Sequence, residues 1–232
     1  MGQDDPREKV LLSWSGGKDS AMALLTLQKA GTYEVVALLT TVTQGYDRIS
    51  IHGVRRTLLE RQAAALNLKL YQVTISKGTT NREYEAKIEV ALRHYLGHGV
   101  RAVAFGDIFL EDLRNYRERN LSRLGMKGLF PIWKRDTGEL VRAFIELGFK
   151  AVVVCVDIRV LDLSFVGQAI NSDFLERLPA HVDPCGEHGE FHSFVYDGPL
   201  FKEPVQYSKG EVVVRGTHFG FCDLVPNKSI LT

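Results

Sequence analysis

Hydrophobic and polar residues along the first half of the chain follow a repeated strand–helix order. Short apolar runs predict strands, and segments with apolar residues at helical spacing predict the helices between them. The predicted strands are 10–14, 34–43, 68–75 and 102–105, and the predicted helices are 21–30, 54–66 and 81–96. Because strands that alternate with helices form a parallel sheet with helices on both faces, this half predicts an α/β fold.

The second half of the chain has a weaker pattern. Beyond a highly charged stretch, the spacing predicts one helix and two strands, at 137–148, 151–156 and 212–215. Residues 178–204 are rich in proline, glycine, histidine and acids, which favours loops. The change of character predicts two domains, at 1–127 and 128–232, of which the second is the smaller.

The segment between the first strand and the first helix, residues 15–20, reads Ser-Gly-Gly-Lys-Asp-Ser. Two glycines allow a sharp turn, and their N–H groups and those of the following helical turn can point at an anion. Lys18 adds a positive charge, and Ser15 and Ser20 add hydroxyl donors. The spacing differs from that of the Walker loop. We expect Lys18 to contact phosphate from the loop–helix edge, so that its replacement would hardly change folding.

A second candidate position follows the strand at 102–105, where the chain reads Gly106-Asp107. Ligands of parallel sheets bind beyond the carboxyl ends of the strands, so this position and the glycine segment could share one site. Asp19 and Asp107 are the predicted Mg²⁺ contacts. Helix capping is the alternative for both acids, with Asp107 preceding a helix that starts near Glu111.

Longer blocks of sequence agree with this motif. Ser-Gly-Gly-Lys-Asp-Ser resembles the signature of the N-type ATP pyrophosphatases. The blocks Gly128-Leu-Phe-Pro-Ile-Trp133 and Asp183-Pro-Cys-Gly-Glu-His-Gly-Glu-Phe-His-Ser-Phe194, with His52-Gly-Val-Arg-Arg56, resemble those of the diphthine–ammonia ligase family. The blocks occur in the family's order from residue 10 to 200.

The resemblance implies an adenine-nucleotide α-hydrolase-like (Rossmann-like) parallel sheet followed by the smaller α/β domain. It also implies that ATP is cleaved to AMP and pyrophosphate, that a carboxylate is adenylated, and that ammonia displaces AMP to give an amide. The implied nucleotide-binding residues are Ser13, Ser15, Gly16, Gly17, Lys18, Asp19, Ser20, His52, Gly106 and Asp107. The implied substrate-binding residues are Arg117, Glu187, Glu190 and His192. The implied catalytic residues are Lys18, Asp19, Glu187 and Glu190.

The third block departs from the family pattern at two positions. His188 stands where a glycine is usual, and His192 stands where an acid is usual. The form Glu-x-Gly-Glu-Phe-His resembles a sister branch, considered bacterial, that is associated with amide chemistry on corrinoid compounds. The family's acceptor is diphthine on elongation factor 2, whose trimethylammonium group an acid would attract. A neutral imidazole would not attract it, so we predict a different carboxylic acid, small or protein-borne.

Composition and net charge limit the partners and the cellular compartment that we expect for this protein. The 232 residues are 45% hydrophobic and 25% charged, with a formal net charge of +1. No apolar run is long enough to cross a membrane, and no global charge recruits nucleic acid, so we expect neither partner. Three separated cysteines, Cys155, Cys185 and Cys222, favour a reducing cytoplasm. Residue 2 is glycine rather than a nucleophilic cysteine, so free ammonia or a partner would supply nitrogen. Homo-oligomers are compatible with the sequence.

Two other functions compete with the ligase. The first is tRNA thiolation, although such enzymes usually carry paired cysteines. The second is nucleotide binding without turnover, which would not need the acids and histidines of the third block. That block could also hold a structural zinc ion, but its spacing fits no zinc signature.

Overall fold

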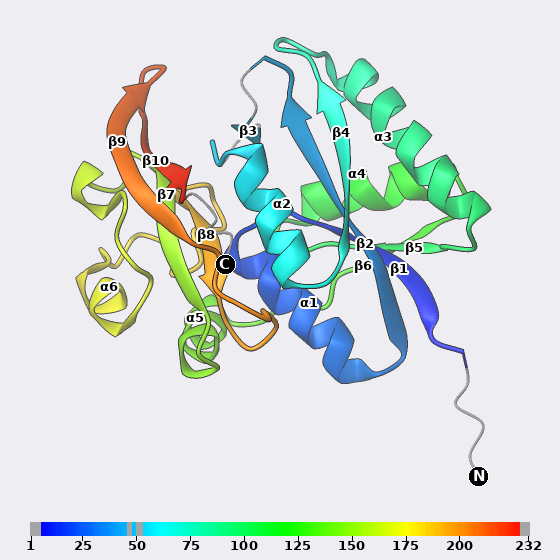
Figure 1. The fold of residues 1–232 in the computed structure, drawn as a ribbon, viewed down its shortest axis with the longest axis horizontal. Coiled ribbons are helices and arrows are strands. Elements are labelled where there is room, and N and C mark those ends of the chain that lie inside the picture. Colours follow the sequence, from blue (N-terminus) through cyan, green and yellow to red (C-terminus); the bar gives the residue numbers. More distant parts are fainter. Residues whose placement is uncertain (1–5, 46–47, 50–52, 228–232) are drawn as a thin grey trace.

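The computed structural model describes residues 6–45, 48–49 and 53–227, and its first layer is a mostly parallel sheet (Figure 1). The parallel strands are β1 (Glu8–Ser13), β2 (Tyr33–Thr43), β4 (Lys69–Ile75), β5 (Ala102–Ala104) and β6 (Lys127–Leu129). They lie in the order β4-β2-β1-β5-β6, and the short β3 (Arg48–Ile49) pairs antiparallel with the end of β2. The predicted parallel sheet is confirmed. The sequence pattern missed β3 and β6.

Four helices cover both faces of this sheet. They are α1 (Lys18–Ala30), α2 (Arg56–Ala65), α3 (Asn81–Gly97) and α4 (Glu111–Ser122). Residues of β1 alternate between two cores: Val10 and Leu12 pack with α1 and α2, whereas Leu11 packs with α3 and α4. The period-2 geometry of a strand therefore explains why β1 is apolar throughout.

The second layer is an antiparallel sheet in the order β8-β7-β10-β9. Its strands are β7 (Lys150–Asp157), β8 (Phe191–Asp197), β9 (Tyr207–Arg215) and β10 (Phe219–Pro226). It is accompanied by α5 (Thr137–Glu146), the 3₁₀ turn η1 (Leu163–Phe165) and α6 (Ser172–Arg177). The predicted smaller α/β unit is therefore present. β8 was expected as loop, and β10 was not predicted.

The two sheets share one hydrophobic core. Leu12 and Leu24 of the first layer belong to the same buried cluster as Val152 and Phe194 of the second. The predicted boundary between residues 127 and 128 falls inside β6, which pairs with β5 in the parallel sheet. The division into domains at that boundary stays a prediction.

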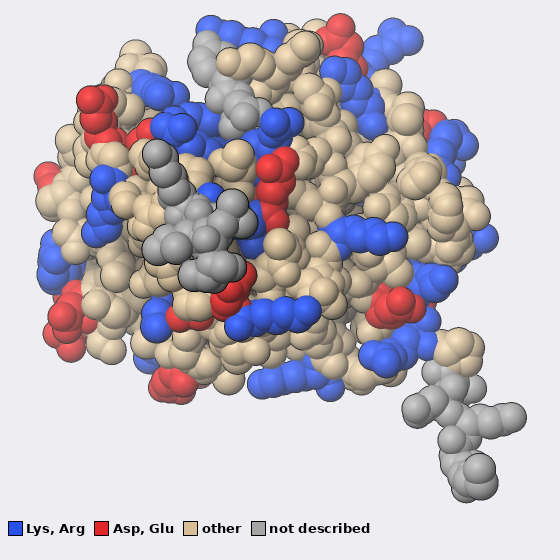
Figure 2. Space-filling model, viewed as in Figure 1, with Lys and Arg blue, Asp and Glu red and all other residues tan. Residues whose placement is uncertain are grey.

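Charges of both signs are interspersed over the face shown in Figure 2, with no continuous field of one sign. This mixture agrees with the formal net charge of +1. In the part of the chain that the structure describes, no helix has the length and apolar character needed to cross a bilayer.

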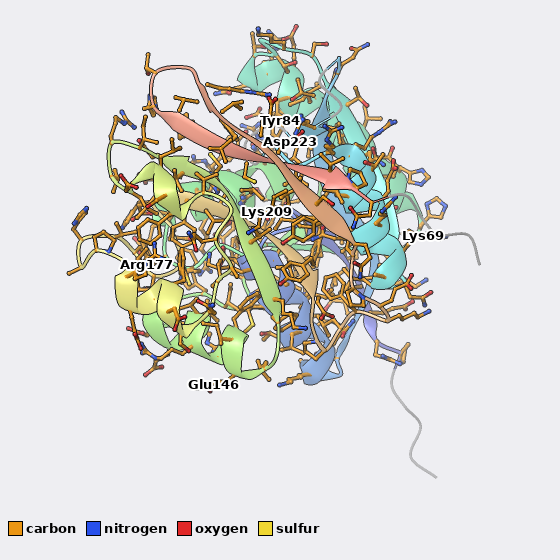
Figure 3. The ribbon with its side chains drawn as sticks, turned by 60° about the vertical axis from the view of Figure 1, so that its left-hand side comes forward. Lys69, Tyr84, Glu146, Arg177, Lys209 and Asp223 are labelled. Atoms are coloured by element: carbon orange, nitrogen blue, oxygen red, sulfur yellow. The ribbon has the colours of Figure 1, made fainter. Side chains whose placement is uncertain are left out.

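A carboxylate on β10 joins the antiparallel sheet to the segment that precedes α2. Asp223, labelled in Figure 3, accepts hydrogen bonds from Arg48 Nη1 at 2.8 Å, Arg55 Nη2 at 2.6 Å and Arg55 Nε at 3.1 Å. The arginine hydrogen bonds hold the pKa of Asp223 well below its usual range. Gly53 has φ of +67°, and a Cβ there would lie 3.0 Å from the Phe221 ring, so glycine lets the two segments approach.

Candidate functional site

The glycine turn joins β1 to α1 at the carboxyl edge of the parallel sheet. Gly16 has φ of +80°, and a Cβ there would lie 2.8 Å from Gln62 Oε1 and 2.9 Å from Leu59 Cδ2. Gly17 is the N-cap of α1, and glycine has no side chain with which to cap the helix. The N–H groups at the start of a helix lack intrahelical partners and can bind phosphate where they face a ligand.

The side chain of Gln62, on α2, holds this turn in place through hydrogen bonds. Its fully buried amide accepts a hydrogen bond from Trp14 Nε1 at 3.0 Å and donates to the carbonyl oxygens of Gly16 at 2.9 Å and Val195 at 2.5 Å. The Val195 N–H also donates to Gly16 O at 2.9 Å. A single side chain therefore holds β1, the glycine turn and β8 together.

β8 contacts the start of α1 directly as well. The Lys18 N–H donates to Ser193 Oγ at 3.2 Å, and a Cβ on Gly17 would lie 3.1 Å from Ser193 O. The residue that follows the second glycine is thus bound to the antiparallel sheet. The glycine turn is therefore held by both layers of the molecule.

Lys18 is buried, contrary to the expectation of an exposed loop–helix edge. Only 3% of the residue is exposed, and Nζ donates to Asp19 Oδ2 at 2.9 Å and to the Cys185 carbonyl. Burial opposes the charge, but Asp19, Cys185 and Glu187 outweigh it and leave the pKa of Lys18 raised. The ammonium is therefore charged at neutral pH, and its removal would affect folding as well as binding.

Asp19 offers an oxygen for a cation. Its Oδ2 is taken by Lys18, whereas Oδ1 is buried and has no hydrogen-bond partner among the described residues. A carboxylate oxygen without a partner is costly unless a ligand completes it. Mg²⁺ commonly uses one or two carboxylates plus substrate phosphates, so this oxygen fits that ion.

The loop before β8 is held by its own acids. Glu190 is 5% exposed, and its oxygens accept from the N–H groups of Asp183 at 3.0 Å and His188 at 2.9 Å. Asp183 Oδ1 accepts from the N–H groups of Cys185 at 2.9 Å and Glu187 at 3.1 Å. Among the described residues, no three acids, histidines or cysteines are grouped to hold a metal ion.

Glu187 projects from this loop toward the parallel sheet. Its Oε1 accepts from the Ile108 N–H at 2.8 Å and, at 3.4 Å, from the Phe109 N–H, just beyond Gly106-Asp107. Burial raises the pKa of Glu187 to about 7, and the Asp19 carboxylate adds to the rise. A carboxyl group that titrates near neutrality can exchange protons with a substrate.

His192 lies on β8 beside the same space. Burial, together with the nearby positive charge of Lys18, lowers the pKa of His192 to about 4. The imidazole is consequently neutral at physiological pH.

One cavity of about 550 Å³ connects these groups. It is lined by Ser13, Ser15, Gly17, Lys18, Asp19, Ser20, Gly106, Asp107, Arg117, Glu187 and His192, together with apolar residues of α3 and α4. Gly106 lies so close to α1 that a Cβ would be 2.9 Å from Ser20 N. The two strand ends predicted to share a site therefore do line one space. Gly16 and Glu190 are not among its lining residues.

Comparison with known proteins identifies the family. A family model described as the diphthamide synthase N-terminal domain matches residues 8–128, and one described as the C-terminal domain matches residues 136–230. The chain belongs to the diphthamide synthase family. The predicted family resemblance is thereby confirmed.

Several relatives of this diphthamide synthase family member are named diphthine–ammonia ligase. Diphthine–ammonia ligase of Schizosaccharomyces pombe is 29% identical over 88% of this chain, which spans only 38% of that protein. The proteins of the same name from Danio rerio and Homo sapiens are 28% and 27% identical over 86% of this chain, and 86% and 83% of their lengths are covered. A solved U34-tRNA thiolase from Methanococcus maripaludis is 18% identical, with a TM-score of 0.37 over 63% of this chain and 60% of that one.

Asp107 and Arg117 of this family member bind each other. Arg117 Nε donates to Asp107 Oδ2 at 2.6 Å, Nη2 donates to Oδ1 at 3.1 Å, and the guanidinium lies 4.2 Å from the Phe105 ring centroid. Both oxygens of Asp107 are occupied by this pair, in contrast to Asp19 Oδ1. His52, which the family resemblance implied as a nucleotide contact, lies outside the described residues.

Gln62 and Ser193 were not predicted as site residues, and Asp183 was considered only as a possible zinc ligand of the third block. Gln62 follows Leu58 by four residues and precedes Leu66 by four, so it falls on the buried face of α2. A polar residue on that stripe was the available signal. Ser193 gave none, because β8 was expected as loop.

Proposed function

We propose that this protein is an ATP-dependent ligase that adenylates a carboxylate and then amidates it with ammonia. The observation that carries the proposal is the meeting of the start of α1, charged Lys18 and Glu187 in one cavity. The relatives named diphthine–ammonia ligase support the reaction class.

Residues of both layers would take part in the reaction. The first turn of α1 and Lys18 would bind and orient the phosphates of ATP, and Lys18 would stabilise charge that develops on them. The acceptor carboxylate would then attack the α-phosphorus, which releases pyrophosphate and leaves an acyl adenylate. Ammonia would attack the acyl carbon and release AMP.

Glu187 is the proposed proton acceptor in the second step. With a pKa of about 7, a useful fraction is ionised at neutral pH and can take a proton from the nitrogen as the amide forms. Glu190 was predicted to be catalytic, but its oxygens are committed to the loop's own N–H groups. We propose that it positions Glu187.

Mg²⁺ is proposed at Asp19. The partnerless Oδ1 fits a cation held mainly by phosphate oxygens, whereas Asp107 would first have to release Arg117. When bound, the ion would neutralise phosphate charge. Isothermal titration of ATP with and without Mg²⁺, on the wild type and Asp19→Asn, tests this assignment. An Mg²⁺ effect that survives the substitution unchanged would contradict it.

The acceptor is proposed to lack a trimethylammonium group. His192 is neutral and lines the cavity, so it provides none of the negative charge that would attract that cation. Diphthine is the competing acceptor, and the names of the relatives favour it. Efficient amidation of diphthine-bearing elongation factor 2 by the wild type would decide for diphthine. Otherwise His188→Gly with His192→Glu should improve that activity, whereas His181→Glu on the exposed end of the loop should not.

The thiolation alternative is disfavoured by the cysteines. All three are buried, and burial raises the pKa of Cys155 and of Cys185 to about 12, so neither provides a thiolate. Product analysis tests the ligase directly. Ion-exchange chromatography should recover AMP and pyrophosphate, and ADP with orthophosphate as the main products would refute the proposal.

A further inference from the structure

β9 forms an open edge of the antiparallel sheet. In the described part of the chain it pairs with β10 alone, and most of its residues are exposed. Figure 3 brings this side forward, and the β9–β10 hairpin crosses the front of the view with Lys209 labelled on β9. A strand edge exposes a row of N–H and C=O groups that can pair with another strand.

An apolar patch lies beside this edge. Val212 and Val214 are each 49% exposed, and Leu163 is 36% exposed. Val214 pairs across the hairpin with Gly220, and Leu163 packs over that glycine. The three side chains therefore lie on one face of the sheet. Natural edges are usually blunted by charge or proline, but the centre of β9 is a run of three valines.

The charges that flank this run are symmetric about its centre. Glu211 lies two residues before Val213 and Arg215 lies two residues after it. If the strand pairs antiparallel with a copy of itself centred on Val213, each Glu211 faces the other copy's Arg215, and each Val212 faces a Val214. Opposite charges directly across an antiparallel pair are favourable.

We propose that β9 is a dimerisation edge, at which two copies of this chain pair antiparallel about Val213 and join their sheets. The proposed partner is β9 of a second copy, because the charges of β9 lie opposite charges of the other sign when the same strand runs antiparallel to it. An unrelated extended segment would satisfy the backbone but not both ion pairs. A two-fold contact of this kind is self-complementary, as homodimer interfaces must be.

Charge reversal tests the register. Sedimentation velocity over about 1–200 µM should show a dimer of the full chain, in the micromolar range expected of a small interface. Glu211→Arg or Arg215→Glu alone places like charges opposite each other and should weaken dimerisation by roughly tenfold or more. The double variant restores opposite charges and should restore the dimer. A wild type that stays monomeric, or a dimer unaffected by both single reversals, would overturn the proposal.

A cross-link provides an independent measurement. Directly opposed residues of an antiparallel pair have Cα atoms about 4.5–5.5 Å apart, within the range of a disulfide. Val213→Cys should therefore form a covalent dimer under mild oxidation, and the native cysteines are buried. The control is Val225→Cys on β10, which is 37% exposed but not on the edge, and should remain monomeric on a non-reducing gel. Equal cross-linking of both variants would contradict the proposed register.

Discussion

Replacing Glu187 by glutamine should stabilise the protein and at the same time impair amide formation. Glutamine keeps the shape of the side chain and an oxygen that can accept the Ile108 N–H, now at 2.8 Å from Oε1. It removes the charge that burial and Asp19 make unfavourable. The two effects have one cause, because the environment that raises the pKa of Glu187 also strains the folded state.

The magnitude follows from the pKa. A carboxyl group whose pKa rises from 4.5 to about 7 on folding binds its proton more tightly in the folded state. Its stabilising effect is present below pH 4.5 and is lost as the pH rises through 7. At about 1.4 kcal/mol per pKa unit, the loss is roughly 3 kcal/mol. Glu187→Gln should thus match the wild type near pH 4 and exceed it by roughly 2–3 kcal/mol at pH 8.

His192 has the opposite dependence. Its pKa falls from 6.5 to about 4 on folding, so the folded state loses stability as the pH drops through that interval. In the wild type the two groups offset each other between pH 4 and 7. In Glu187→Gln the contribution of His192 is no longer masked, and stability should rise with pH over the same interval.

Urea denaturation at intervals from pH 4 to 8.5 measures these differences, with Glu146→Gln on the exposed end of α5 as the control. Pyrophosphate exchange and ammonia-dependent amide formation should be followed separately. We expect amide formation to fall by about 10² or more while exchange is less affected. If Glu187→Gln is no more stable than the wild type at pH 8, the Glu187 carboxylate is not in the buried surroundings beside Asp19 that would raise its pKa.

Three further substitutions test the site and its support. Lys18→Ala should weaken ATP binding about ten- to a hundred-fold in calorimetry and also lower the melting temperature, whereas normal stability would show that the ammonium is not buried. Gln62→Ala should reduce the free energy of unfolding by roughly 3 kcal/mol, because it removes one hydrogen-bond partner from a buried indole N–H and from two carbonyls, while Glu60→Ala on the exposed face of α2 should change it little. Asp223→Ala should cost about 1–2 kcal/mol in urea denaturation at pH 7 and less at pH 2, because the stabilising effect of a lowered pKa is lost progressively as the pH falls below the unfolded-state value; an equal cost at both pH values would exclude the ion pairs as its source.

The first half of the fold could be predicted because each element is locally encoded. The apolar strands, the helical spacing and the Gly31 stop all act over a few residues, and the structure confirms these elements. β8 was missed because its preceding loop is dense in glycine, proline and acids, and because its residues face buried surroundings on both sides. Its strand character depends on pairing with β7, which lies about forty residues earlier in the chain.

The site could be predicted only in part, because some of its contacts join residues that are distant along the chain. The glycine turn and Glu187 carry their chemistry in their residue types. The burial of Lys18 could not be predicted, because it depends on the Cys185 carbonyl and on β8, which lie far from Lys18 along the chain. The pairing of Asp107 with Arg117 likewise requires knowing where α4 places the guanidinium.

Lys18 links the two titrations on which the proposed chemistry depends. Its positive charge lowers the pKa of His192 and opposes the rise at Glu187. Nucleotide phosphates placed beside Lys18 would partly cancel that charge, so the pKa of both groups should rise when ATP binds. For Glu187 the rise favours the protonated form while pyrophosphate is still present, and release of pyrophosphate favours the carboxylate. The proposed base would therefore become most effective after adenylation, at the step where ammonia must lose a proton.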